Sequence, residues 1–185
     1  IRQREPCFPT AADWRVQTDR DAVYQRVRRA GIHWHPLRYH KRPSSLATAW
    51  DVAVGTLLSL WLVLRHRVGI VHARSYVPAV IALVVTGLTG TKFLFDMRGF
   101  WADERVDGGL WPPDGVMYRA AKWFERRFLL RADEVISLTH AAARELEQFD
   151  YLTDRMRPVT VIPTCADLAR FYPRPRSERT EGTFT

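Results

Sequence analysis

The sequence lacks several features that would reveal a function directly. It contains two cysteines, Cys7 and Cys165, which lie near opposite ends of the chain without ligand or disulfide spacing. A structural zinc site is therefore not expected, and free thiols fit a reducing compartment. Neither a GxGxxG nor a GxxxxGKS/T phosphate loop occurs, and there is no GxSxG elbow, which leaves a dehydrogenase, a kinase and a serine hydrolase poorly supported.

Long hydrophobic runs are also missing. The apolar run over residues 52–64 is well short of the roughly 20 residues that a membrane span needs, and the run over residues 77–88 is shorter still. The start of the chain is charged and contains two prolines, unlike a signal peptide. We therefore expect both runs to form core helices of a cytoplasmic protein that touches the inner face of a membrane without crossing it.

Basic residues exceed acidic ones, with 28 Lys and Arg against 20 Asp and Glu and a formal net charge of +8. Such an excess fits a nucleic acid, an anionic membrane surface, a phosphorylated substrate or simply a solvated face. No nucleic acid is expected as a partner, because the sequence has no helix-turn-helix signal and no aromatic stacking platform. A metal at His33, His35 and His40 is not expected either, since Arg38 and Lys41 would repel a cation.

The stretch over residues 70–104 predicts one complete strand, helix, strand unit. Apolar runs at 70–73 and 92–97 predict two strands, and the apolar segment 76–88 predicts a crossover helix, so the strands must be parallel. Further helices are expected over residues 19–29, 46–66, 116–131 and 139–149, and further strands over residues 32–39, 134–138 and 159–162. About five strands alternating with five helices indicate an α/β fold with a doubly wound parallel sheet.

Polar residues at the ends of these strands are the candidate site. In open parallel sheets ligands bind beyond the carboxyl ends of the strands, so the pairs Arg74-Ser75 and Arg98-Gly99 should face one crevice. The segment 103–115 is rich in glycine and proline and is expected to be a mobile loop over that crevice. Arginine suits phosphate or carboxylate, and carboxylates suit sugar hydroxyls or proton transfer. The alternative is that Arg98 pairs with Asp96 or Glu104 only to hold the loop.

Four segments together resemble a known family. IVHARSYVPAVIAL, FLFDMRGFW, ADEVISLTHAAARELEQF and VTVIPTCADLARFYP are similar, in order and spacing, to the amino-terminal half of the family 4 retaining glycosyltransferases. The resemblance covers about residues 32–173 and implies the GT-B arrangement of two Rossmann-like domains facing each other across a cleft. Residues 1–165 would then be the acceptor domain, without the family's first strand, and residues 166–185 a linker toward an absent donor-binding domain.

The resemblance also implies a chemistry. A nucleotide sugar would be the donor and a glycan or lipid-linked molecule the acceptor, with retention of the anomeric configuration and no metal or other cofactor. Many members carry His-Gly at the position of Arg98-Gly99 and Asn-Gly at Thr164-Cys165. The candidate catalytic residues are Arg98, Asp103 and Glu104, and the candidate substrate-binding residues are Arg74, Ser75, Asp96, Gly99 and Thr139.

Two further expectations accompany this assignment. The basic face of the helix over residues 116–131, formed by Arg119, Lys122, Arg126 and Arg127, is expected to rest on anionic lipid. The other function that the residues leave open is a binding module of the same fold, which would hold a sugar or a phosphate without turning it over.

Overall fold

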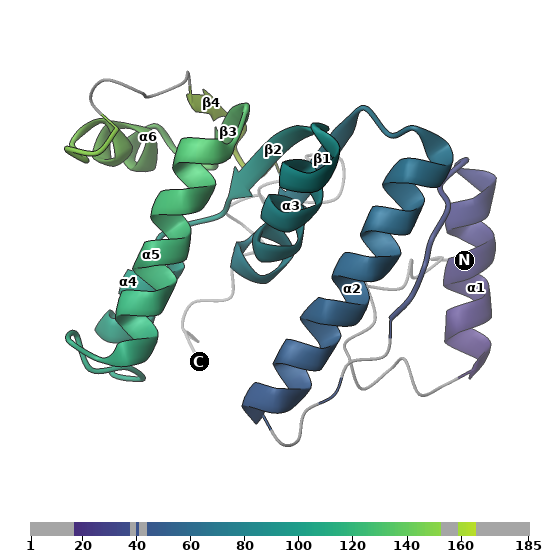
Figure 1. Cartoon of the computed structure of the whole chain (residues 1–185), viewed down its shortest axis with the longest axis horizontal. Coiled ribbons are helices and arrows are strands. Elements are labelled where there is room, and N and C mark those ends of the chain that lie inside the picture. The colour runs from purple at the N-terminus through teal and green to yellow at the C-terminus, as the bar shows by residue number, and fades with distance from the viewer. Residues whose placement is uncertain (1–16, 38–39, 41–43, 153–158, 166–185) are drawn as a thin grey trace, which may run out of the picture.

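The computed structural model describes residues 17–37, 40, 44–152 and 159–165, and the expectations for the start of the chain and for the linker over residues 166–185 lie outside this part. The described residues form six helices and four strands (Figure 1). In chain order these are α1 (Gln17–Arg29), α2 (Ser44–His66), β1 (Ile70–Arg74), α3 (Tyr76–Thr89), β2 (Lys92–Met97), α4 (Trp101–Asp107), α5 (Val116–Arg131), β3 (Glu134–Ser137), α6 (His140–Glu147) and β4 (Val159–Val161).

The four strands form one parallel sheet in the order β1-β2-β3-β4. Arg74 lies beside Asp96 in the register of β1 and β2, and Met97 lies beside Ser137 in the register of β2 and β3. The last residues of three strands therefore meet at one edge of the sheet. The predicted α/β class and the parallel pairing are confirmed.

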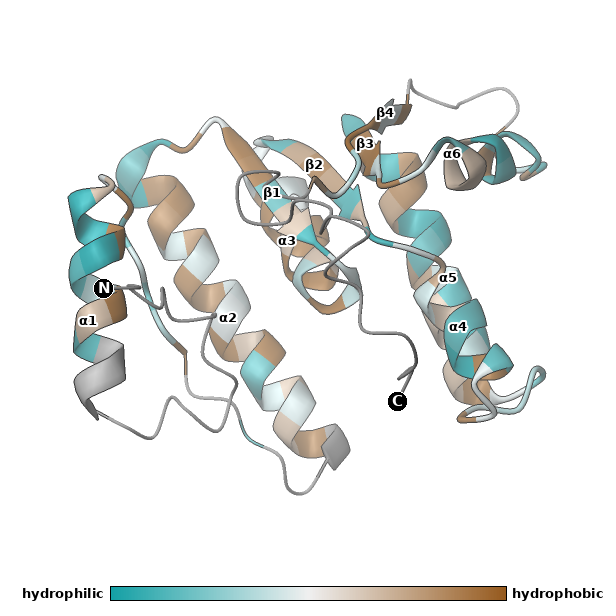
Figure 2. Ribbon diagram, turned by 180° about the vertical axis from the view of Figure 1, so that it is seen from behind, coloured by the Kyte–Doolittle hydropathy of each residue, from teal (hydrophilic) through white to brown (hydrophobic). Residues whose placement is uncertain are grey.

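The hydrophobic core lies between the sheet and the helices of one face. Burial alternates along β2, where Phe93, Phe95 and Met97 are buried. Figures 1 and 2, which view the molecule from opposite sides, place α3 and α5 on the same side of the strands. Phe128 of α5 packs on Phe95 with ring centroids 5.3 Å apart, and each such buried side chain contributes about 1.5 to 3 kcal/mol. This packing fixes α3 and α5 relative to the strand ends.

Helix α2 packs beside α3 at very short range. Gly55 is buried, and a Cβ there would lie 2.8 Å from Cδ1 of Ile81, so a larger residue would require the end of the Ile81 side chain to move. The prediction that residues 52–64 form a core helix is wrong, because only 17% of the most apolar 18-residue stretch of α2 is buried. Within the described residues, the stretch Leu46–His66 is the one helix long and apolar enough to cross a membrane by length and composition.

Three other local predictions are corrected. Residues 32–37, the described part of the expected strand 32–39, form neither strand nor helix; Pro36 has no amide proton, and the N–H of Ile32 donates to the carbonyl of Val27. Residues 103–107 are helical in α4 rather than looped, since no glycine or proline interrupts them and Ala102 anchors the helix in the core. The first helix begins at Gln17, before the predicted start.

Candidate functional site

A cavity of about 270 Å³ opens beyond the carboxyl ends of β1 and β2, where the parallel sheet predicts a ligand site. Its lining residues are Ser75, Tyr76, Arg98, Gly99, Trp101 and Glu104. The structure thus brings together Ser75, Arg98, Gly99 and Glu104, which were predicted from the sequence. Tyr76 and Trp101 were not predicted as site residues, although Tyr76 follows Ser75 and Trp101 lies two residues after Gly99 in the sequence.

Ser75 forms the turn between β1 and α3. Its backbone has φ 71° and ψ 177°, a conformation that is normal for glycine but costs other residues about 1 to 3 kcal/mol. Its N–H donates to the carbonyl of Asp96 at 3.1 Å, and its own carbonyl accepts from the N–H of Ala79. These bonds hold Ser75 at the amino end of α3, where unpaired N–H groups and the helix dipole favour an anionic group.

Arg98, Gly99 and Glu104 form the opposite wall. The Glu104 carboxylate lies so close to Gly99 that a Cβ there would collide with it. Arg98 is exposed, and within the described part of the chain no ion pair joins it to Asp96 or Glu104. The alternative, that Arg98 pairs with Asp96 or Glu104 only to hold a loop, therefore does not agree with the structure. The cavity presents one cationic and one carboxylate side chain from adjacent segments.

Asp96 and Arg74 interact with each other outside the cavity lining. Oδ2 of Asp96 lies 3.5 Å from Nε of Arg74 and 3.6 Å from Nε2 of His72. Oδ1 of Asp96 is buried, and no hydrogen-bond partner for it is found among the described residues. The substrate-binding roles of Arg74 and Asp96 stay predictions.

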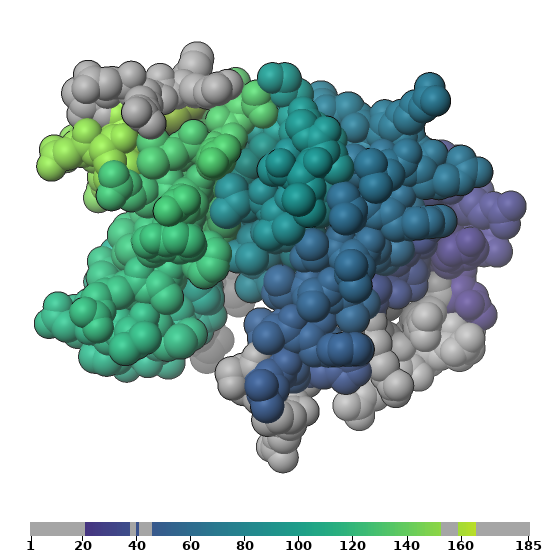
Figure 3. Space-filling view, in the orientation of Figure 1, coloured from purple at the N-terminus to yellow at the C-terminus, as the bar shows by residue number. Residues whose placement is uncertain are grey.

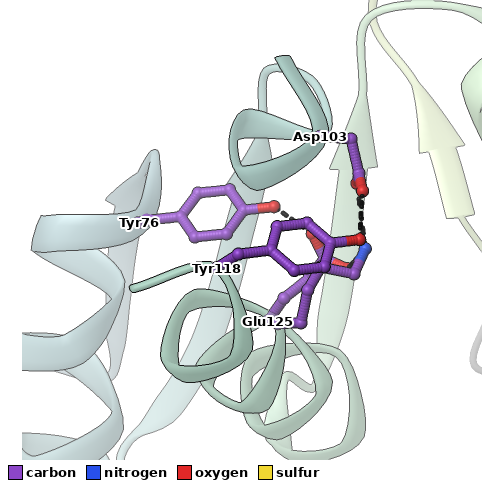
Figure 4. Close-up of polar contacts among 5 residues, drawn as sticks. Tyr76, Asp103, Tyr118 and Glu125 are labelled. Atoms are coloured by element: carbon purple, nitrogen blue, oxygen red, sulfur yellow. Dashed lines mark hydrogen bonds and ion pairs between the residues drawn. The ribbon is translucent and has the colours of Figure 1, made fainter. Parts of the chain in front are cut away.

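Asp103 is part of a polar network that links α3, α4 and α5 (Figure 4). It accepts hydrogen bonds from the hydroxyl of Tyr118 at 2.8 Å and from Nζ of Lys122 at 2.9 Å. Lys122 also donates to Glu125 at 2.5 Å, and the hydroxyl of Tyr76 donates to the same carboxylate. Because Tyr76 lines the cavity and Asp103 belongs to α4, the network fixes both walls of the cavity to α5.

The network raises the pKa values of Tyr76 and Lys122. Glu125 is fully buried, and Tyr76 and Lys122 donate hydrogen bonds to its side chain. Burial, followed by the charge and the hydrogen bond of Glu125, raises the pKa of Tyr76 above its usual range. Burial alone would disfavour the charged form of Lys122, but hydrogen bonds to Glu125 and Asp103 outweigh this and raise its pKa. Tyr76 therefore stays neutral and Lys122 stays charged over the physiological range.

Sequence reasoning missed the network for a specific reason. Lys122 was grouped with the outward basic residues of α5, whereas it turns inward and Arg126 lies over the ring of Tyr151 at 5.0 Å. The available signal was Glu125, the only acid of α5, three residues after Lys122. An acid on the apolar side of a basic helix needs a partner inside the protein.

The remaining predicted residue, Thr139, lies at the start of α6. Its hydroxyl accepts from the N–H of Ala142 at 3.1 Å, so Thr139 caps the helix that was expected to begin there. Thr139 is not among the residues that line the cavity. Its substrate-binding role stays a prediction.

No metal centre is found in the described part of the chain, where no group of three or more His, Cys, Asp and Glu side chains could hold an ion. His40 interacts with the side chain of Asp51. Its ring nitrogen Nδ1 lies 2.6 Å from Oδ1, and its backbone N–H donates to Oδ2. This carboxylate belongs to α2. Cys165 is an exposed free thiol, as predicted.

The family model described as "Glycosyl transferase 4-like domain" matches residues 9–165. No curated protein matches the chain.

Proposed function

We propose, on the premise that this chain belongs to the glycosyl transferase 4-like domain family, that it is the acceptor-binding half of a retaining hexosyltransferase. The enzyme would transfer a sugar from a nucleotide sugar to a glycan or lipid-linked acceptor, without a metal. Membership of this family supports transferase activity in general. The observation that carries the finer proposal is the cavity at the strand ends, where Arg98, Glu104 and the amino end of α3 meet.

These groups match the charges that develop during sugar transfer. The bond between the anomeric carbon and the departing diphosphate breaks, which leaves negative charge on the phosphate and positive charge on the sugar. Arg98 can bind the phosphate oxygens, and the N–H groups at the start of α3 add positive potential. Such placed charges stabilise a transition state more than water does, because they need no reorganisation.

Glu104 suits the acceptor. As its carboxylate lies against Gly99, it can accept a hydrogen bond from a sugar hydroxyl, and the hydroxyl proton can leave toward it or toward the departing phosphate. The new bond then forms between the acceptor oxygen and the anomeric carbon. Retention requires attack from the face that the diphosphate leaves, which fits a cavity holding Arg98 and Glu104 side by side.

A second candidate function is a binding module that holds a sugar or a phosphate without transfer. The placement of Asp103 favours it, because this predicted catalytic carboxylate is engaged by Tyr118 and Lys122. Glu104 is then the carboxylate that lines the cavity. An anion site formed by Arg98 and α3 would suffice for such a module.

The deciding experiment measures nucleoside diphosphate release from a panel of sugar nucleotides, with lipid and sugar acceptors, by the protein that carries this domain. We expect release that depends on an acceptor, and a fall of about 10²- to 10³-fold in kcat for Arg98→Ala. Arg144→Ala is the matched control, since Arg144 is an exposed arginine on α6, and it should retain activity. Binding of a sugar or phosphate acceptor without release of nucleoside diphosphate would favour the binding module. Full activity of Arg98→Ala would refute the role of Arg98.

A further inference from the structure

The backbone conformation of Ser75 favours a different residue type. Its φ of 71° and ψ of 177° lie in a region that is populated almost only by glycine. Within the described part of the chain, Arg67 is the other non-glycine residue with a positive φ, and its φ of 50° is closer to the left-handed helical region. A glycine at position 75 would form the same turn without strain, so the turn itself does not require a serine.

The side chain of Ser75 does not cap the helix that follows it. A capping side chain accepts from the N–H of the second or third residue of its helix, and the third residue of α3 is Pro78, which has no N–H. Thr139, by contrast, accepts from Ala142, the third residue of α6. Among the residues that the structure describes, the Ser75 hydroxyl has no hydrogen-bond partner. The side chain therefore brings a free donor to the cavity that it lines.

The surroundings of Ser75 maintain its strained conformation. Its N–H donates to the carbonyl of Asp96 near the end of β2. Figure 3 shows α3 between α2 and α5 on the face toward the viewer. Ile81 of α3 packs closely against α2, and Tyr76 donates a hydrogen bond to Glu125 of α5. A strained residue persists only where the structure around it leaves no alternative, so the amino end of α3 cannot turn to relieve the strain.

We propose that Ser75 is a substrate-binding residue whose hydroxyl donates a hydrogen bond to a phosphate oxygen bound by Arg98. The two side chains line one cavity of about 270 Å³, so a single phosphate group can reach both. Glu104 lines the same cavity and would accept from a hydroxyl of a sugar joined to that phosphate. This inference rests on the proposed function, and it identifies the chemical group that Ser75 binds.

A sugar hydroxyl is the other group that the Ser75 hydroxyl could bind, but phosphate fits the cavity better. Arg98 is exposed, and no carboxylate of the described residues forms an ion pair with it, so its charge is available to an anion. A hydrogen bond to a charged acceptor is about twice as strong as one between neutral groups. Phosphate binding would thus offset more of the strain at Ser75 than sugar binding would.

The test measures the affinity for inorganic pyrophosphate and the melting temperature of variants of the protein that carries this domain. Ser75→Ala removes the hydroxyl and keeps the strain, so we expect the affinity to fall by about tenfold or more and the melting temperature to stay unchanged. Ser75→Gly should lose the same affinity but melt about 2 to 8 °C higher, because glycine adopts this conformation without strain. Arg67→Gly is the matched control; it also relieves a positive φ, but Arg67 is exposed and lies outside the cavity lining, so the affinity should not change.

A soluble alkyl phosphate, tested in the same way, distinguishes the two sources of phosphate. An effect of Ser75→Ala on pyrophosphate would assign the diphosphate of the donor, and an effect on the alkyl phosphate alone would assign a phosphorylated acceptor. The proposal fails if neither ligand binds, if Ser75→Ala binds both as tightly as the unchanged protein, or if Ser75→Gly melts no higher than Ser75→Ala.

The same variants separate this inference from the proposed function. Phosphate binding that depends on Ser75, without release of nucleoside diphosphate from any sugar nucleotide, would support the inference and refute the transferase. Release by Ser75→Ala with unchanged kcat and KM would refute the inference and leave the transferase standing.

Discussion

Replacing the buried carboxylate of Glu125 is the most direct test of how the cavity is held. Glu125→Gln keeps the volume of the side chain and removes its charge. The amide oxygen can still accept from the hydroxyl of Tyr76, which turns the amide nitrogen toward Lys122, so two donors face each other. Lys122 loses its partner at 2.5 Å and keeps Asp103 at 2.9 Å.

The size of the effect follows from these contacts. A hydrogen bond to a charged group contributes about 1.5 to 3 kcal/mol, so we expect Glu125→Gln to lower the free energy of unfolding by about 2 kcal/mol. Glu125→Ala should cost about 3 to 5 kcal/mol, because it leaves Lys122 and Tyr76 without this acceptor and opens a cavity. Adding Lys122→Met to Glu125→Gln should cost less than the sum of the two changes, as both partners are then neutral.

Urea unfolding followed by circular dichroism and tryptophan emission measures these changes. Glu147→Gln is the matched control, since Glu147 is exposed on α6, and it should change stability by less than about 0.5 kcal/mol. In the transferase assay, Glu125→Gln should lower kcat more than it raises KM, because the walls of the cavity lose their attachment to α5. The reasoning would be refuted by a Glu125→Gln variant as stable as the Glu147→Gln control.

Two further predictions follow from the site. Gly99→Ala should push the Glu104 carboxylate out of the cavity and lower activity. The free energy of unfolding measured in urea should change by less than about 1 kcal/mol, because the displaced atoms are the end of a flexible side chain. Unchanged activity would argue against the role of Glu104. Burial raises the pKa of Tyr76 above its usual range and that of Tyr151 to about 12 in the folded protein. Both tyrosines therefore contribute their full stabilisation below the ordinary tyrosine pKa of 10.0. This contribution is lost as the pH rises through the pKa values of the folded state. The melting temperature should therefore fall at alkaline pH, and Tyr76→Phe should flatten that fall; an identical slope in the variant would contradict the assigned cause.

The parallel sheet and the position of the cavity could be predicted because both depend on local sequence. Strand β2 was predicted with its observed bounds, Lys92–Met97, because its apolar run is flanked by polar residues. Once two strands are joined by a crossover helix, their carboxyl ends must lie together. The meeting of Ser75 with Arg98 and Gly99 follows from that geometry alone.

The parts that could not be predicted depend on contacts between distant segments. Whether Asp103 faces the cavity or α5 is decided by Tyr118 and Lys122, which lie in another helix. The exposure of α2 was also missed, because hydropathy measures how apolar a side chain is but not what covers it. Trp50 and Leu57 are of residue types that are common in protein cores, yet they lie on the surface.

The origin of the cavity residues within a short stretch of chain has a consequence for synthesis on the ribosome. Every lining residue lies between Ser75 and Glu104, whereas Glu125, which fixes the cavity walls to α5, lies further along the chain. Because the segments that form the cavity walls are close in sequence, they can come together at small entropic cost while α5 is still being made. They gain their final rigidity only when α5 docks, so the nascent domain has a pocket before it has a fixed one.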